Sequence, residues 1–523
     1  MTKLPSSPTH PWRAGEWPVF DKLNQDLSTD VLVIGGGIAG LTTAYLLAKD
    51  GRDVTLIDSS KPGDGETGNT SAHLSSALDD YFYKLEELFG RDGSLLAAKS
   101  HRSAINAIEA ICDQENIDCH FERVDGFLFA AKPSHDDMIS KEFDAAKRAG
   151  FDNLDLGAKI PFVGFTEALS LHFPQQAQFH PILYLQGLTR AIMRLGVKIY
   201  TECEAVDIGE GKSVKVKTRS GPTITAEHVV VATNTPMNNR FTIHTKQAPY
   251  RTYILGFEIQ KGAIPKGLFW DTEDSYHYIR TEDLNANQSL LIIGGEDHKV
   301  GQEEDPEQCW ARLEAWTRAH IPQAGNLVKK WSGQVNEPID GLAYIGRNPG
   351  EQNVYIVTGD SGHGLTHGTI AGLIISDLIN DTKNPWESLY SPSRVNIHAD
   401  AMKEFFKENL NVALQYKDYF TPGDVKSFDD VGMGEGAIVR DGLRKIAAYR
   451  DHNNELQCCS AVCPHLGGIV HWNKAEKTWD CPCHGSRFAT DGAVINGPSK
   501  SNLRPMSKTK PKRDESPRQT AQP

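Results

Sequence analysis

The sequence predicts an α/β domain that opens with a strand–helix–strand unit, an α+β lobe beside it, and a small all-β domain at the carboxyl end. Three observations lead to this fold class. A glycine-rich turn joins an apolar strand to an apolar helix after residue 30, strand-like and helix-like stretches fill the middle of the chain, and two loops with cysteine and histidine flank a short hairpin near residue 470. A chain of 523 residues is too long for a single hydrophobic core, since domains average ~150 residues.

Composition and charge describe a globular protein that does not bind nucleic acid. The net charge is −13 and 39% of the residues are hydrophobic, whereas a protein that binds phosphate backbones needs a basic surface. No apolar run approaches the ~18 residues of a membrane span, and the opening MTKLPSSPTHPWRAGEW lacks the apolar stretch of a signal peptide. The nine cysteines form no disulfide framework. We therefore expect a cytoplasmic protein without a membrane span.

The first glycine motif predicts a dinucleotide-binding unit. In DVLVIGGGIAGLTTAYLLAKDGRDVTLIDSS a strand precedes Gly35, a helix follows Gly37, and a second strand ends at Asp58. Gly35 permits the tight turn, Gly37 lets the backbone approach a pyrophosphate, and Gly40 lets helix and strand pack closely. The helix amino terminus offers amide hydrogens to the phosphates, and Asp58 is placed to bind ribose hydroxyls. The predicted site also includes Ile38, Ala39 and Ser59.

Two later segments have the pattern of the same kind of domain. AEHVVVATNTP is an apolar strand that ends at Thr233 and Asn234. NVYIVTGDSGHGLTHGTIAGLIISDLI contains a strand, a glycine-rich turn and a helix that we expect to begin near Thr366. The glycines of this turn free the backbone to approach a ligand closely.

Together these segments resemble the glycine/D-amino-acid oxidase (DAO) family of flavoproteins, over about residues 12–390. The loop GDGETGNTSAHLSS, residues 63–76, fits the same family because it is rich in small and hydroxyl residues. The resemblance implies a Rossmann-like FAD-binding domain of the DAO/glutathione-reductase type with an α+β substrate domain, and FAD rather than NAD. It implies FAD contacts for Thr67, Ser71, Ala72, His73, Val206, Thr233, Gly359, Gly362, Gly364, Leu365 and Thr366.

Some details of the flavin site stay open at this stage. His73 fits a covalent flavin link or a proton carrier, but also an ordinary loop histidine bonded to backbone. His363 and His367 flank the second glycine turn, where histidines bonded to backbone are equally expected. Asn234 stands where the family usually has glycine.

The carboxyl-terminal loops CPHLGG and CPCHGS each carry a cysteine and a histidine. Two thiolates and two imidazoles, from Cys463, His465, Cys481 and His484, suit either a structural zinc or a [2Fe-2S] centre in which two histidines replace two cysteines on one iron. Zinc sites are commoner, but zinc fingers usually carry both histidines on one helix, whereas here each loop holds both ligand types. The residues between the loops read as two strands around a polar turn at 473–477.

The spacing C-x-H, fifteen residues, C-x-x-H, followed by Gly-Pro at 497–498, resembles the Rieske family over about residues 430–500. The resemblance implies a small all-β domain with a Rieske [2Fe-2S] cluster. In it, Cys463 and Cys481 bind one iron, and His465 and His484 bind the other.

Two positions depart from the respiratory Rieske proteins. Gly468 stands where they have the disulfide partner of Cys483, so that disulfide cannot form. Ser486 matches their serine, but Phe488 replaces a tyrosine that hydrogen-bonds to the sulfur ligands. Fewer hydrogen bonds to sulfur predict a reduction potential below the respiratory range.

The predicted domains follow from these two resemblances. We assign 1–80, 156–245 and 335–380 to the FAD-binding domain, 81–155 and 246–334 to the substrate domain, 381–431 to a linker with one helix, 432–505 to the Rieske domain and 506–523 to a disordered tail. Polar residues on the strand-like part of the substrate domain are candidates for substrate contact, and an arginine among them would clamp a carboxylate. They are Arg251, Tyr253, Tyr276, His277, Tyr278 and Arg280.

The leading hypothesis is an FAD-dependent oxidoreductase. An amine or amino-acid-like small molecule transfers a hydride to FAD, and electrons then pass singly through the cluster to an external carrier. Two alternatives stay open: an oxidase that uses oxygen and has a structural Rieske module, and a non-enzymatic redox sensor or electron-transfer module.

Overall fold

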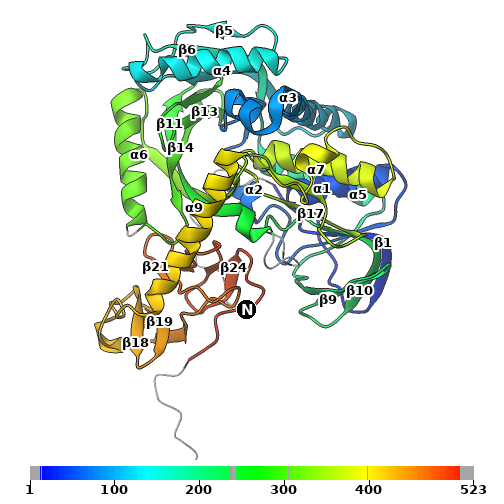
Figure 1. The fold of residues 1–523 in the computed structure, drawn as a ribbon, viewed down its shortest axis with the longest axis vertical. Coiled ribbons are helices and arrows are strands. Elements are labelled where there is room, and N and C mark those ends of the chain that lie inside the picture. Colours follow the sequence, from blue (N-terminus) through cyan, green and yellow to red (C-terminus); the bar gives the residue numbers. More distant parts are fainter. Residues whose placement is uncertain are drawn as a thin grey trace, which may run out of the picture.

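The computed structural model describes residues 12, 15–235, 237, 243–303, 305–396 and 398–506. Figure 1 shows the carboxyl-terminal strands in orange beneath the rest of the chain, with helix α9 (Ala399–Gln415) running down to them. The tail predicted to be disordered lies outside the described residues, apart from Met506. In the part of the chain that is described, no helix is both long and apolar enough to cross a bilayer.

An eight-stranded sheet contains the predicted strand–helix–strand unit. Its order is β16 (Tyr344–Arg347), β17 (Val354–Thr358), β10 (Thr223–Val231), β1 (Leu27–Ile34), β2 (Val54–Ile57) and β7 (Lys198–Tyr200), with β9 (Val214–Thr218) pairing with β10 and β8 (Ala205–Ile208) pairing with β9. β1 lies parallel to both β2 and β10. Such strands are covered by helices and therefore read as continuous apolar runs, which confirms the predicted α/β class.

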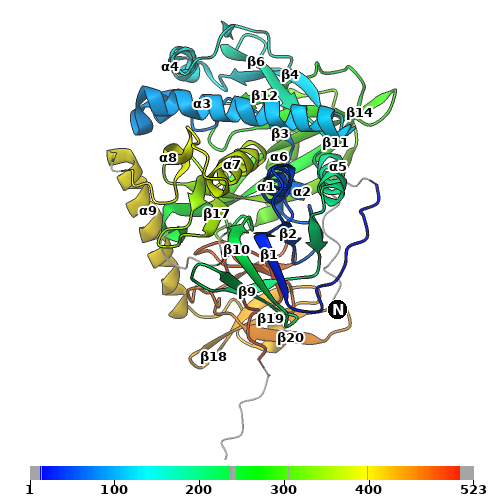
Figure 2. The same ribbon diagram turned by 90° about the vertical axis from the view of Figure 1, so that its right-hand side faces the viewer.

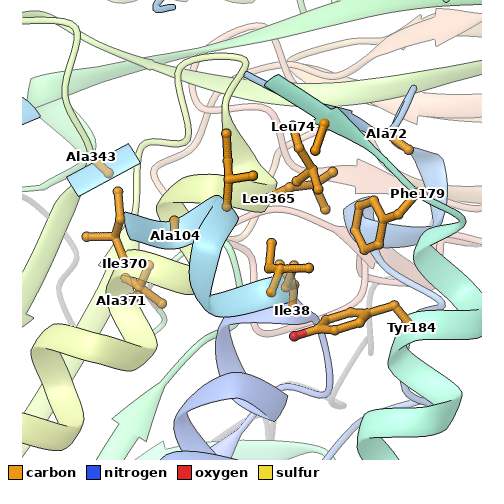
Figure 3. Close-up of a cluster of buried hydrophobic side chains, with 14 of the residues drawn as sticks. Ile38, Ala72, Leu74, Ala104, Phe179, Tyr184, Ala343, Leu365, Ile370 and Ala371 are labelled. Atoms are coloured by element: carbon orange, nitrogen blue, oxygen red, sulfur yellow. The ribbon is translucent and has the colours of Figure 1, made fainter. Parts of the chain in front are cut away.

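Four helices pack together on one face of this sheet: α1 (Ile38–Lys49), α3 (Phe82–Glu115), α5 (Pro181–Arg194) and α7 (Gly364–Ile379). α7 and α1 are in close contact where Gly372 of α7 meets Thr42 of α1. A Cβ at Gly372 would lie only 2.6 Å from the Thr42 side chain, so glycine allows this close approach. Figure 2 shows the long helix α3 lying across α7 and α5. Figure 3 shows Ile38 of α1, Ala104 of α3, Tyr184 of α5 and Leu365 of α7 meeting in one buried apolar cluster.

A nine-stranded sheet forms the second lobe. Its order is β15 (Leu327–Pro338), β11 (Gln247–Gln260), β14 (Gln288–Lys299), β13 (Tyr278–Asp283), β12 (Leu268–Asp271), β4 (Glu122–Phe129), β6 (Ser170–Gln178) and β3 (His73–Leu74), with β5 (Asp155–Leu156) on β6. Helix α6 (Pro306–His320) packs against β11 and β14, and α4 (Asp136–Arg148) packs against α3.

Two parts of this lobe differ from the expectation. Residues 79–155 are helix-like in sequence, yet β4 lies among them and pairs with β6 and β12. β3 and β6 also join the nine-stranded sheet, although the predicted boundaries place their residues in the FAD-binding domain. These strands pair with partners more than a hundred residues away, such as His73 with Gln178 and Gly126 with Leu268, and local periodicity carries no information about such pairing.

The carboxyl-terminal region is all β. Its two small sheets are β18 (Gly436–Asp441), β19 (Arg444–Arg450) and β20 (Leu456–Ser460), and β21 (His471–Asn473), β22 (Thr478–Asp480), β23 (Arg487–Phe488) and β24 (Val494–Asn496). β21 and β22 form the predicted hairpin around the turn at 473–477. The preceding helix α9 lies within the segment 381–431 that we assign to the linker.

Candidate cofactor and substrate sites

The turn between β1 and α1 has the backbone that a bound pyrophosphate requires. Gly35 has φ of 111°, and a Cβ there would lie 2.5 Å from the Ala232 carbonyl oxygen. A Cβ at Gly40 would collide with the Gly35 carbonyl. The N-cap residue of α1 is Gly37, which has no side chain to bond to the first turn. Of the first two amides, that of Ile38 bonds to the Thr67 hydroxyl, and that of Ala39 has no partner among the described residues and remains available to phosphate oxygens.

Asp58 and Thr67 brace this turn. The Asp58 carboxylate accepts hydrogen bonds from the Gly36 amide at 2.6 Å and the Ser60 amide at 2.7 Å. Burial raises the pKa of Asp58 despite these two bonds. Thr67, in the short helix α2 (Glu66–Asn69), accepts a hydrogen bond from the Ile38 amide at 3.2 Å. Asp58 thus lies beside the glycine turn, as its predicted ribose-binding role requires, and Ser59 follows it directly.

The second glycine turn precedes α7, which begins at Gly364, two residues before the expected start. Gly359 and Gly362 have φ of 76° and 71°, a conformation that side-chain-bearing residues rarely adopt. No described side chain caps this helix either. Asn234 takes a φ of 61°, which asparagine tolerates better than most residues, so its replacement of glycine is accommodated.

The other predicted FAD residues occupy varied positions. Leu365 and Thr366 are buried, and the Thr366 hydroxyl bonds to His101 Nδ1 at 2.8 Å. The Thr233 hydroxyl donates to the Thr235 carbonyl at 2.9 Å. Val206 lies at an irregularity in the pairing of β8 with β9.

Arg280 hydrogen-bonds to the backbone of the loop from Ser71 to His73. The Arg280 guanidinium donates to the Ala72 carbonyl at 2.7 Å and to the Phe179 carbonyl at 3.2 Å, and it also bonds to Glu282. Ala72 has φ of 63° and is fully buried. His73 Nδ1 pairs with the Ser71 hydroxyl at 3.0 Å. Burial lowers the pKa of His73 to about 3, so its imidazole is neutral near pH 7.

Two of the candidate substrate residues meet beside the second glycine turn. The Tyr276 and Tyr278 rings lie 5.6 Å apart, and Tyr278 lies 5.5 Å from His73. The Tyr276 hydroxyl donates to Asp79 Oδ2 at 2.6 Å. Asp79 in turn lies 3.4 Å from His363 Nε2. This brings residues from three distant segments into one polar group.

The remaining candidates do not join this group. Arg251 bonds to Glu476 at 2.6 Å and 3.0 Å, and Tyr253 bonds to His298 at 2.8 Å. His277 pairs with Asp271 at 2.8 Å and stacks on Trp316 of α6. Successive strand residues face opposite sides of a sheet. Because Thr252 reaches Tyr278 at 2.7 Å, its neighbours Arg251 and Tyr253 face the opposite side.

Sequence reasoning missed the acidic residues around the second glycine turn. Asp79, Asp80, Glu337 and Asp360 all lie near His363, and Ser361 bonds to both Asp80 and Glu337 at 2.8 Å. Burial raises the pKa of Asp360 to about 7 and that of Asp80 to about 6. The available signal was the pair Asp-Asp at 79–80, directly after the small-residue loop.

The four predicted cluster ligands lie together in two pairs. Cys463 and Cys481 are each 2% exposed and their thiols are hydrogen-bonded to one another. The His465 and His484 rings lie 5.0 Å apart. Across the described ranges, no group of three or more His, Cys, Asp or Glu side chains is placed to hold a metal ion. A [2Fe-2S] centre takes two protein ligands per iron, and the pair of thiols and the pair of imidazoles fit that ligand set.

The surroundings of the thiol pair also match the family pattern. Ser486 is fully buried and its side chain hydrogen-bonds to Cys463. A Cβ at Gly468 would lie 2.5 Å from Cys483 Sγ and 3.2 Å from Cys481 Sγ. Phe488 is fully buried. The lower potential that we derive from Phe488 and Gly468 stays a prediction.

The comparisons with known proteins agree with the predictions for both the amino-terminal flavoprotein part and the carboxyl-terminal Rieske part. Residues 30–378 match the family described as FAD dependent oxidoreductase (DAO), and residues 421–507 match the Rieske [2Fe-2S] domain. YhfW of Bacillus subtilis (strain 168), described as a Rieske 2Fe-2S iron-sulfur protein, is 31% identical over 93% of this chain and 95% of its own length.

Two further proteins resemble the amino-terminal part. The gamma-glutamylputrescine oxidoreductase of Escherichia coli (strain K12) is 24% identical and covers 70% of this chain and 87% of its own length. The crystal structure of glycine oxidase from Geobacillus kaustophilus has a TM-score of 0.59 at 18% identity and covers 71% of this chain and 99% of that one.

These matches decide the question that the cysteines and histidines left open, in favour of the iron–sulfur cluster over zinc. The amino-terminal part binds FAD and the carboxyl-terminal domain binds a [2Fe-2S] cluster. The chain belongs to the DAO family of FAD-dependent oxidoreductases and carries a Rieske domain at its carboxyl end.

Proposed function

We propose that this enzyme oxidises an amine or amino-acid-like substrate by hydride transfer to FAD and delivers the electrons singly, through the [2Fe-2S] cluster, to an external carrier. The similarity to a gamma-glutamylputrescine oxidoreductase supports substrates with a CH–NH bond. FAD accepts two electrons with a hydride, whereas the cluster accepts one at a time. The chain's own residues bind and orient the substrate and exclude water around it.

The observation that carries this proposal is a direct contact between the two halves. Asn496, the last residue of β24 and directly before the Gly-Pro pair, donates to Glu66 Oε1 at 2.6 Å. Glu66 Oε2 accepts a hydrogen bond from the backbone amide of Gln334 at 2.8 Å. Glu66 immediately precedes Thr67, which bonds to the first turn of α1. The two predicted cofactor sites are therefore joined by a short run of protein contacts.

The second contact lies at the cluster loop itself. Gly485 follows the ligand His484, and a Cβ there would lie 2.5 Å from Pro249 and 2.8 Å from Gln334 Nε2. Since no larger residue would fit at this position, the loop must lie directly against strands β11 and β15. This close seating supports electron transfer within the chain rather than a purely structural role for the Rieske domain.

The test is anaerobic mixing with a panel of amines and amino acids. Flavin bleaching and the paramagnetic signal of the reduced cluster are followed together. We expect one substrate to bleach the flavin and then to produce the cluster signal. A Cys481→Ser variant, which lacks one cluster ligand, should still bleach but give no cluster signal. Bleaching in the wild type without any cluster reduction would contradict the proposed route.

A second candidate function is an oxidase that passes electrons to oxygen, favoured by the fold shared with glycine oxidase. Its signature is hydrogen peroxide formed in equal amount to the substrate consumed. Peroxide at that level, with the cluster remaining oxidised, would favour this alternative.

A further inference from the structure

We propose that the substrate site recognises an amine cation through Tyr276, Tyr278, Asp79 and Asp297, and that amines without an α-carboxylate are preferred over the corresponding α-amino acids. This inference rests on the proposed function and specifies its substrate class.

Both arginines that sequence reasoning offered as carboxylate clamps already have partners. Arg251 is 4% exposed and is bound by Glu476 and Ser332 on the side of the sheet that faces away from Tyr278. Arg280 is fully buried and is bound by Glu282 and two backbone carbonyls. Recognition of a carboxylate by arginine normally uses both arms of the guanidinium fork. One nitrogen of each guanidinium, Arg251 Nη1 and Arg280 Nε, has no hydrogen-bond partner among the described residues. The other nitrogens are occupied, so neither arginine offers the two free nitrogens that a fork requires.

The tyrosines and Asp79 converge at the glycine turn. A Cβ at Gly362 would lie 2.8 Å from Asp79 Oδ2 and 3.5 Å from the Tyr276 hydroxyl. A Cβ at Gly294 would collide with the Tyr278 ring, so this glycine allows the ring to lie across strand β14. Two aromatic rings 5.6 Å apart and a carboxylate thus border the turn that resembles the family's flavin-contacting motif.

Asp297 supplies a second carboxyl group, and one of its oxygens lacks a hydrogen-bond donor among the described residues. It lies on β14 close enough to influence both tyrosines, and the Thr252 side chain bonds to it. Within the described part of the chain, its Oδ1 atom is buried and has no hydrogen-bond partner. A buried unpaired oxygen is costly. An ammonium group would supply the missing donor.

The charges around the site favour a cation. His363 is the nearest basic group, and Asp79, Asp80 and Asp360 surround it and offset its charge. His73 is neutral near pH 7. Aromatic faces attract ammonium groups, and the attraction is stronger when water is excluded. A substrate carboxylate would instead meet Asp79, and like charges repel strongly in a site of low dielectric.

The test compares probes that differ only by the α-carboxylate: 1,4-diaminobutane with ornithine, and 1,5-diaminopentane with lysine. Binding to the FAD-loaded enzyme is measured by the perturbation of the flavin spectrum under anaerobic conditions, separately from bleaching. We expect each diamine to bind at least about tenfold more tightly than its amino acid, which corresponds to 1.4 kcal/mol or more.

Two variants test whether Asp79 and Asp297 bind the ammonium group of the diamine. Asp79→Asn and Asp297→Asn should each weaken diamine binding by tenfold or more while retaining the flavin absorption that reports folding. Asp125→Asn, which changes a half-exposed aspartate on β4, is the matched control and should bind like the wild type.

The outcomes separate this inference from the proposed function. Diamines that perturb the spectrum but never bleach the flavin would leave the recognition intact and contradict the oxidation. Ornithine binding as tightly as 1,4-diaminobutane would overturn the inference. So would unchanged diamine affinity in both site variants, or the absence of any spectral response to the diamines.

Discussion

At the scale of single residues, Gly468 explains why this Rieske domain lacks the disulfide of its respiratory relatives. A Cβ placed on Gly468 would lie 3.4 Å from Cys483 Cβ. Disulfides need Cβ atoms about 3.5 to 4.5 Å apart. The backbone is therefore almost in the geometry for a bridge, and a single missing side chain prevents it.

We predict that Gly468→Cys forms a disulfide with Cys483 on mild oxidation. Closing a loop of about 15 residues stabilises a folded chain by roughly 3 kcal/mol in the chain-entropy description. Thiol titration should show the loss of two reactive thiols, and urea unfolding should show the added stability, reversed by reductant. Gly432→Cys, in an exposed loop, is the control and should gain one thiol without added stability.

Glu142 gives a pH-dependent prediction away from both cofactor sites. It is 1% exposed and accepts hydrogen bonds from the Phe82 and Tyr83 amides at 3.0 and 3.3 Å, at the start of α3. Burial raises the pKa of Glu142 from 4.5 to about 7, despite these bonds. The folded state therefore holds its proton more tightly than the unfolded chain does.

The stability from this proton is fully present below pH 4.5 and is lost as the pH rises towards 7. We predict that the free energy of unfolding of the wild type falls across this window relative to Glu142→Gln, by about 3 kcal/mol at most. Urea unfolding at several pH values measures the difference. A constant difference between the two proteins across the window would contradict the prediction.

At the scale of elements, the turn between β21 and β22 fastens the Rieske domain to the nine-stranded sheet. Glu476 in this turn bonds to Arg251 of β11 and to Ser332 of β15, and lies 2.9 Å from Arg487 of β23. Burial alone would raise its pKa, but the two arginines hold the pKa of Glu476 at about 2. A carboxylate at the tip of one hairpin thus joins strands of two domains.

Glu476→Gln should loosen this junction. Removing one partner of a buried ion pair costs about 3 to 5 kcal/mol, because the remaining charges stay buried without compensation. We expect a lower urea midpoint and faster proteolysis between α9 and β18. Glu435→Gln is the matched control, because its partner Lys477 is well exposed; proteolysis no faster than in this control would contradict the assignment.

At the scale of the whole molecule, the Rieske domain is held at several separate places. Besides Glu476 and the Asn496–Glu66 contact, the Lys500 carbonyl accepts from Arg219 next to β9 at 2.8 Å. Tyr416 and Tyr419, which follow α9, donate to the carbonyls of Leu466 and Gly467 at 2.5 and 2.6 Å. Contacts this widely spaced resist rotation about any one of them.

We therefore predict that the domain does not swing during turnover. Small-angle X-ray scattering should give the same radius of gyration for the oxidised protein and for protein reduced with dithionite. An increase on reduction in the wild type would show a mobile domain instead.

The sequence was sufficient for the features that lie within short segments. The glycine turns at residues 35–40 and 359–364, the Cys and His loops, and the hairpin between them each need only a few consecutive residues. Their conformations follow from local sterics, such as the positive φ of Gly359 and Gly362. FAD and [2Fe-2S] binding could be predicted for the same reason.

The sequence was not sufficient for contacts between distant segments. Period-two alternation shows that Arg251 and Thr252 face opposite sides of a strand, but not which side faces the substrate. Asp79 becomes a candidate only when folding brings Tyr276, 197 residues away, against it.

By itself, then, the sequence determined which cofactors this protein carries and predicted which residues hold the irons, because those motifs are local and sterically demanding. The tertiary structure alone decided that Arg251 bonds to the Rieske domain, that Asp79 and Tyr276 border the second glycine turn, and that the two halves contact each other at several places. The physical reason is that burial and ion pairing depend on which surfaces meet, and this is settled by the packing of the whole chain.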